Sequence, residues 1–109
     1  MTALTWLYLS GAILSEVFGT MSLRIAAGGR TAWYGVMLAA YVVAFSLIAL
    51  ALGAGMPLGI GYGIWVAAGV ALTALLARIV FKEPLTPLMI FGIGLICAGV
   101  LLVELGAGL

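Results

Sequence analysis

Four apolar segments, each about twenty residues long, fill nearly all of this 109-residue sequence. A helix of about 20 apolar residues is long enough to cross roughly 30 Å of hydrocarbon. We place the segments at about residues 4–24, 32–52, 58–81 and 87–105. Only 6% of the residues are charged, which is too few to coat a soluble core. The sequence therefore predicts an all-α membrane protein whose four transmembrane helices form a single domain.

The breaks between the segments are short and chemically suited to turns. Residues 26–31 are small and polar, residues 53–57 contain two glycines and a proline, and Lys82-Glu83-Pro84 is charged and ends in proline. Such connections leave no room for a separate soluble domain. No basic residue precedes the first apolar segment and Glu16 interrupts it, so we expect a permanent span rather than a secretory signal.

Several kinds of chemistry lack the residues that they need. The chain has no His, no Asp and a single cysteine, Cys97, in an apolar segment. This composition excludes a disulfide framework within the chain, metal sites built from His or paired Cys, and a Ser-His-Asp triad. We expect a protein that is not an enzyme, that needs no cofactor or metal, and that binds no nucleic acid.

The four basic residues all flank two of the three connections. Arg24 and Arg30 lie around the first connection, and Arg78 and Lys82 lie around the third, whereas the other side of the membrane carries none. Because cytoplasmic loops carry an excess of Lys and Arg, we expect the first and third loops to face the cytoplasm and both termini to face outward. The predicted location is the cell membrane, or inner membrane, crossed several times.

Glu16 is the only charge in the first 23 residues, and an acid within a span is costly and usually functional. Its helical neighbours are Ala12, Gly19, Thr20 and Leu23, most of them small, so they leave space beside the acid. A carboxyl in a low-dielectric cavity can exchange protons near working pH. It can bind a proton or an organic cation, but hardly both, and that exclusivity is enough to couple two fluxes.

Two structural explanations for Glu16 are an ion pair with Arg24 or Arg78 and a neutral acid that is hydrogen-bonded to another helix. Both arginines lie towards helix ends, about a dozen ångströms along the axis from a carboxyl at mid-span. We therefore favour the functional interpretation.

The third segment supplies aromatic companions. Tyr62 and Trp65 are three residues apart and can share a helix face. Aromatic faces bind cations, most strongly when the cation is desolvated. By itself this pair is typical of packing, but with an intramembrane acid elsewhere in the chain it indicates a cation site.

The fourth segment carries small residues that suit close helix packing, and four helices are few to surround a transport pathway. We predict a dimer interface on this segment; packing within one chain is the alternative. The interface residues are Gly92, Gly94, Ala98 and Gly99.

Together these features resemble the small multidrug resistance family, whose members are four-helix, proton-coupled exporters that work as antiparallel dimers. The resemblance covers the whole chain and lies in its order and spacing of motifs. These are Ser15-Glu16-Val17-Phe18-Gly19-Thr20, Gly28 and Trp33, Ile60-Gly61-Tyr62-Gly63-Ile64-Trp65, and Leu95-Ile96-Cys97-Ala98-Gly99-Val100.

The resemblance implies a role for each candidate residue. Glu16 matches the carboxylate shared by protons and substrate, and Tyr62 and Trp65 match aromatic residues that line the substrate cavity. The segment from Gly92 to Gly99 matches the dimer seam. The residues that match the surroundings of the carboxylate are Ala12, Ile13, Gly19 and Thr20.

The resemblance also implies a substrate class. Gly19-Thr20 after the acid resembles the multidrug branch, which predicts an antiporter that exchanges protons for lipophilic or quaternary ammonium cations. Lys82-Glu83-Pro84-Leu85 also occurs in guanidinium exporters, so guanidinium or polyamine export is an alternative, as is a non-transporting membrane assembly subunit.

The one-sided distribution of basic residues bears on the dimer. Family members that pair with themselves head to tail generally have balanced charges, and this chain does not. We therefore consider one subunit of a heterodimer beside a homodimer. Glu104, near the end of the fourth segment, is most simply an acid at the membrane interface.

Overall fold

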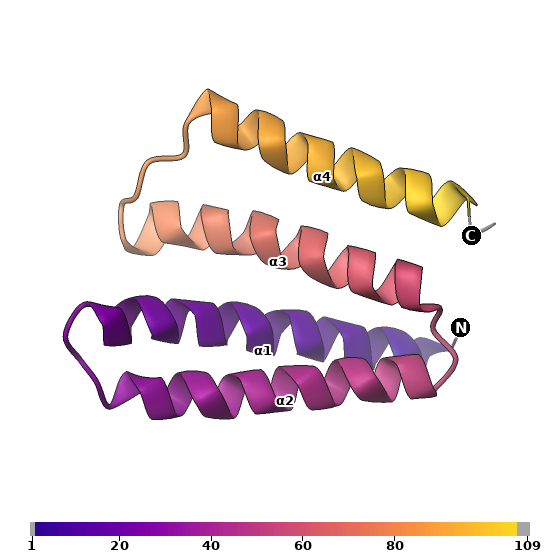
Figure 1. Ribbon diagram of the computed structural model, residues 1–109, viewed down its shortest axis with the longest axis horizontal. Coiled ribbons are helices and arrows are strands. Elements are labelled where there is room, and N and C mark those ends of the chain that lie inside the picture. The colour runs from indigo at the N-terminus through magenta and orange to yellow at the C-terminus, as the bar shows by residue number, and fades with distance from the viewer. Residues whose placement is uncertain (1, 107–109) are drawn as a thin grey trace. The chain divides into compact units, whose positions relative to one another are not determined.

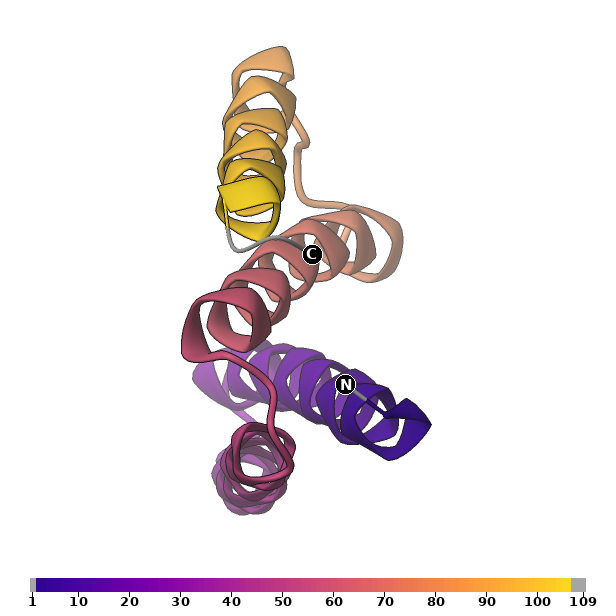
Figure 2. The ribbon, with the colours of Figure 1, turned by 90° about the vertical axis from the view of Figure 1, so that its right-hand side faces the viewer.

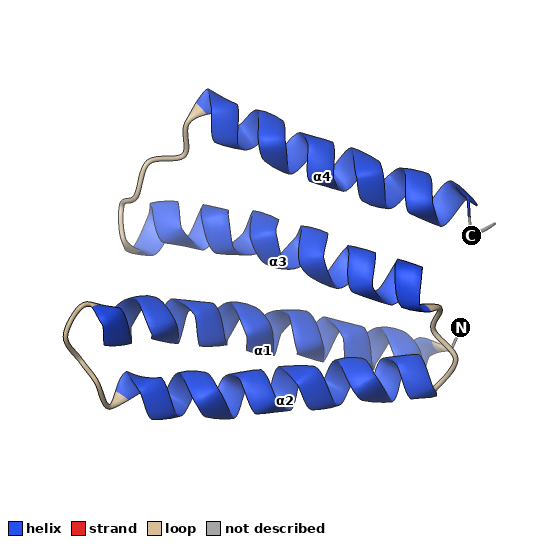
Figure 3. Ribbon diagram, in the orientation of Figure 1, coloured by secondary structure: helices blue, strands red, loops and turns tan. Residues whose placement is uncertain are grey.

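Four helices joined by short loops make up the computed structural model, which describes residues 2–106 (Figure 1). No strand occurs within that range, as Figure 3 shows. The predicted all-α fold is thus confirmed. The helices are α1 (Ala3–Ala27), α2 (Trp33–Gly53), α3 (Leu58–Val80) and α4 (Pro87–Gly106).

The ends of α1 follow from its sequence. The Thr2 hydroxyl accepts a hydrogen bond from the Thr5 amide at 3.4 Å and so satisfies one of the free N–H groups of the first turn. The helix runs three residues beyond the expected end at Arg24, because the following Ile-Ala-Ala segment contains no helix breaker. The chain turns only at Gly29, whose φ of 121° disfavours any residue with a Cβ.

The chain divides into two compact units, Met1–Met56 and Pro57–Leu109. In the first unit α1 and α2 pack side by side as an antiparallel hairpin (Figures 1 and 2). Glycines allow the close approach. A Cβ on Gly11 would lie 3.0 Å from Leu47, and one on Gly19 would lie 2.7 Å from the ring of Tyr41. Assembly of all four helices into one transmembrane domain stays a prediction.

The second unit is a looser hairpin of α3 and α4. The start of α3 lies against the end of α4, where Cβ atoms built on Gly59 and Gly63 would lie 3.5 Å from Val103 and 3.6 Å from Val100. Towards the connecting loop the two ribbons are further apart (Figure 1). Within the described chain, α4 has no buried residue.

Among the helices of residues 2–106, three are long and apolar enough to cross a membrane, namely α2, α3 and α4. The helix α1 has 25 residues but is not in this group, because Glu16, Arg24 and several hydroxyl side chains lower its apolar character. Those hydroxyls are largely satisfied within the helix. Ser10 donates to the Trp6 carbonyl and Ser22 to the Phe18 carbonyl, both at 2.9 Å, which suits a helix in lipid.

Candidate functional site

The Glu16 carboxyl lies in the middle part of α1 and is half-buried. The Thr20 hydroxyl, one turn further along, lies 3.2 Å from Oε1 and 3.0 Å from the Glu16 carbonyl oxygen, and it can donate to either. The other carboxylate oxygen, Oε2, is buried and has no hydrogen-bond partner among the described residues. Thr20 therefore orients one of the two carboxylate oxygens.

The structure adds a residue that the sequence analysis missed, Tyr41 on α2. Its hydroxyl lies 2.8 Å from the Thr20 hydroxyl, which links α2 to the acid through one intervening side chain. Tyr41 stands in an apolar segment with no neighbouring charge, so its own surroundings give no signal. The only signal is the glycine next to Thr20, because a glycine marks where another helix can come close.

The four residues expected around the acid occupy different environments. Ala12 is fully buried, and Ile13 and Thr20 are half-buried. Gly19 is buried beneath the Tyr41 ring, so at this position the space beside the helix is filled by a side chain of the same unit. Thr20 is the neighbour that contacts the carboxylate directly.

The alternative of an ion pair with Arg24 finds no support in α1. Among the described residues, Thr20 supplies the only side-chain hydrogen bond to the Glu16 carboxylate. Arg24 is two turns away, about 12 Å along the axis. The acid in α1 is thus held by a neutral hydroxyl, which leaves its charge uncompensated by that contact.

Tyr62 and Trp65 contact each other on α3. Their ring centroids are 6.1 Å apart and the ring planes make an angle of 76°, the edge-to-face arrangement favoured by aromatic pairs. Trp65 is 9% exposed, whereas Tyr62 is 56% exposed. The pair therefore combines one buried ring with one exposed ring. The Tyr62–Trp65 pair belongs to the second unit, whereas Glu16 belongs to the first.

The small residues of α4 face open space. A Cβ built on Gly92, Gly94 or Gly99 would have no heavy atom of the described chain within 4 Å. Ala98 is also exposed. Within the second unit, these residues therefore do not pack closely against α3.

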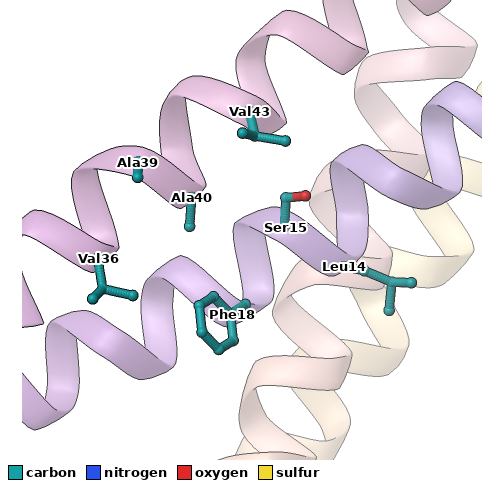
Figure 4. A pocket seen from close by; sticks show the side chains of 7 residues that line it. All are labelled: Leu14, Ser15, Phe18, Val36, Ala39, Ala40 and Val43. Carbon is teal, nitrogen blue, oxygen red and sulfur yellow. The ribbon is translucent and has the colours of Figure 1, made fainter.

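A groove of about 390 Å³ lies between α1 and α2 in the first unit (Figure 4). Its wall is apolar except for one hydroxyl, that of Ser15, and Glu16 is not part of it. A charged ligand would find no counter-charge there. The lining residues are Leu14, Ser15, Phe18, Val36, Ala39, Ala40 and Val43.

The chain is similar to known transport proteins over most of its length. It is 40% identical over 101 residues to the Multidrug transporter PA4990 of Pseudomonas aeruginosa, with 92% of this chain and 91% of that relative covered. It is 41% identical over 101 residues to the Multidrug transporter EmrE of Escherichia coli, with the same coverage. It is 37% identical over 103 residues to the Multidrug resistance protein mmr of Mycolicibacterium paratuberculosis, with 94% and 96% covered.

The profile of the family described as Small Multidrug Resistance protein matches residues 4–96, which include α1, α2, α3 and the first half of α4. With three helices apolar enough to cross a bilayer, this match identifies a multi-pass membrane protein. The chain belongs to the small multidrug resistance family.

Proposed function

We propose that this protein is an antiporter that exports lipophilic or quaternary ammonium cations in exchange for protons. The observation that carries the proposal is the Glu16 carboxyl, an acid in a membrane-length helix with one oxygen oriented by Thr20 and the other without a partner among the described residues. The names of the relatives, which include two multidrug transporters, support export of drug-like molecules.

Exchange follows from the chemistry of a single carboxylate. When the site faces outward, a proton binds Glu16, neutralises it and displaces the cation. When the protonated site faces inward, it releases the proton, and the ionised carboxylate attracts the next cation. Because proton and cation compete for the same charge, the carboxylate carries one of them at a time, and this exclusivity couples the two fluxes.

Tyr62 and Trp65 are proposed to supply the apolar and π surfaces that hold the organic part of the cation. Their edge-to-face contact presents two ring surfaces at a steep angle, against which an organic cation can pack. A flat or tetrahedral lipophilic cation gains from such a corner, whereas a strongly hydrated metal ion gains less.

The working unit is proposed to be an antiparallel dimer joined through α4. The open surface over Gly92, Gly94 and Gly99 supports this role, because small residues let helices of two chains approach closely. The partner is a second copy or a related subunit with the opposite charge bias. The proposed orientation places the loops after α1 and α3 in the cytoplasm and both termini outside. The side of the membrane on which a C-terminal tag is accessible distinguishes the homodimer from the heterodimer. A mixed population of orientations contradicts a fixed orientation and therefore contradicts the heterodimer.

Substitution of the acid tests the function directly. In Glu16→Gln we expect loss of proton release on addition of tetraphenylphosphonium to the purified protein, and loss of uphill export in proteoliposomes, because the amide cannot ionise. The matched control is Glu104→Gln, which removes the half-buried acid near the end of α4.

Glu104→Gln should release protons and transport like the wild type. Uphill export by Glu16→Gln would remove Glu16 from the role of coupling group. Equal losses in both variants would point to a general effect of removing an acid from the helices.

One alternative is export of guanidinium compounds or polyamines, which the loop Lys82-Glu83-Pro84-Leu85 supports. The other is a non-transporting assembly subunit. A panel of cations tested for proton release separates these possibilities. Release with guanidinium or a polyamine but not with quaternary ammonium would change the substrate class, and release with none would favour the assembly subunit.

A further inference from the structure

The Glu16 carboxyl is the end of a chain of three polar groups that starts on another helix. The Tyr41 hydroxyl lies 2.8 Å from the Thr20 hydroxyl, and the Thr20 hydroxyl lies 3.2 Å from Glu16 Oε1. Both distances join described residues of one compact unit. In a low-dielectric environment, hydrogen bonds in series polarise and strengthen one another.

The number of protons on each group determines which group donates in this series of hydrogen bonds. The Thr20 hydroxyl has one proton, and an ionised carboxylate can only accept. When Thr20 donates to Glu16 Oε1, its own oxygen is free to accept, and Tyr41 is the donor within reach. When Glu16 is protonated, the Thr20 proton can turn to the Glu16 carbonyl oxygen at 3.0 Å. As a donor to Thr20, the tyrosine thus keeps the single Thr20 proton available for Glu16.

The position of Tyr41 depends on the shape of α1. A Cβ on Gly19 would lie 2.7 Å and 2.8 Å from two carbons of the Tyr41 ring, so only glycine leaves room for the ring where it stands. The glycine beside Thr20 and the tyrosine on α2 therefore form one fitted contact.

We propose that Tyr41 is a positioning residue for transport, which acts through the Thr20 hydroxyl to fix the orientation of the Glu16 carboxylate towards its cation. The inference rests on the proposed function, since it assigns a supporting residue to the same site. It predicts that Tyr41 matters only while Thr20 has a hydroxyl.

A double-mutant cycle tests the dependence on Thr20. In Tyr41→Phe, which keeps the ring over Gly19, we expect the affinity for tetraphenylphosphonium at high pH to fall about two- to tenfold, the worth of one hydrogen bond. Thr20→Val should lose at least as much, and adding Tyr41→Phe to it should change nothing further. Thr20→Ser, which keeps the hydroxyl, should bind like the wild type.

Infrared difference spectra report the carboxyl band of Glu16, which should not shift if Tyr41 has only a structural role. The carboxyl band that disappears in Glu16→Gln should shift in Tyr41→Phe, because its hydrogen bonding changes. Tyr34→Phe, on the exposed surface of the same helix, is the matched control and should leave both the band and the affinity unchanged.

The outcomes separate this inference from the function on which it rests. If the wild type releases protons and Glu16→Gln does not, the antiporter stands. In that case, an unchanged band and affinity in Tyr41→Phe overturn the role of Tyr41, and so does an equal loss in the presence and absence of the Thr20 hydroxyl. If the wild type itself releases no protons, the proposed function fails first.

Discussion

Gly19→Ala is the smallest change that strikes the contact between α1 and α2. The added methyl carbon would lie 2.7 Å from Cδ1 and 2.8 Å from Cε1 of Tyr41, and 3.3 Å from the Cβ of Ala40. Ordinary contacts between carbon atoms begin near 3.4 Å, so the ring must move by about 0.7 Å. A shift of that size takes the 2.8 Å bond between Tyr41 and Thr20 towards the limit of hydrogen bonding.

The expected free-energy change follows from three terms. Overpacking costs about 1–3 kcal/mol. The lost hydrogen bond costs about 0.5–1.5 kcal/mol. Replacing a helical glycine by alanine gains about 1 kcal/mol. The variant should therefore be destabilised by about 0.5–3.5 kcal/mol, with most of the cost arising from the tyrosine ring.

Reversible unfolding in mixed detergent micelles, at fixed protein concentration, measures this quantity. Gly35→Ala on α2 is the matched control, because a Cβ there meets no atom within 4 Å and only the helix-propensity gain remains. The penalty of Gly19→Ala should vanish in a Tyr41→Ala background. If Gly19→Ala is as stable as Gly35→Ala, or if its penalty survives removal of the ring, the packing described for Tyr41 is wrong.

Two further substitutions test the aromatic pair and α4. Trp65→Leu should weaken tetraphenylphosphonium binding by about 1–2 kcal/mol, because a desolvated cation loses an aromatic face. Trp6→Leu in α1 is the control and should leave binding unchanged. Equal effects of the two substitutions in equilibrium titrations would argue against a cavity role for Trp65. Gly94→Leu should weaken self-association by roughly 1–3 kcal/mol without unfolding the chain, because its Cβ meets no atom of the described chain. Gly53→Leu, equally open, is its control. If the dimer fraction measured by sedimentation is unchanged in Gly94→Leu, the dimer interface does not lie at Gly94.

The helices were predictable because long apolar runs and Gly or Pro breaks are local signals. The end of α1 lies three residues beyond the predicted boundary at Arg24, because the helix has no breaker before Gly28. Glu16 was equally visible, because an acid in an apolar run stands out without any tertiary information.

The partner of Thr20 was not predictable in this way. Which residue of α2 lies over Gly19 depends on the rotation and axial shift of one helix against the other, and both are set by packing rather than by local sequence. The contact of Tyr62 with Trp65, by contrast, joins residues three apart on one helix and could be expected from helical geometry alone.

The modest apolarity of α1 has a consequence for how the protein enters the bilayer. On insertion scales an acid at the centre of a helix costs about 2.5–3.5 kcal/mol. This cost arises in α1, which is not among the three clearly apolar helices and so has less apolar surface to offset it. Its packing partner α2 is among the three clearly apolar helices. The first stable inserted species during synthesis is therefore expected to be the α1–α2 hairpin, with the acid helix retained in the lipid by the helix that is made after it.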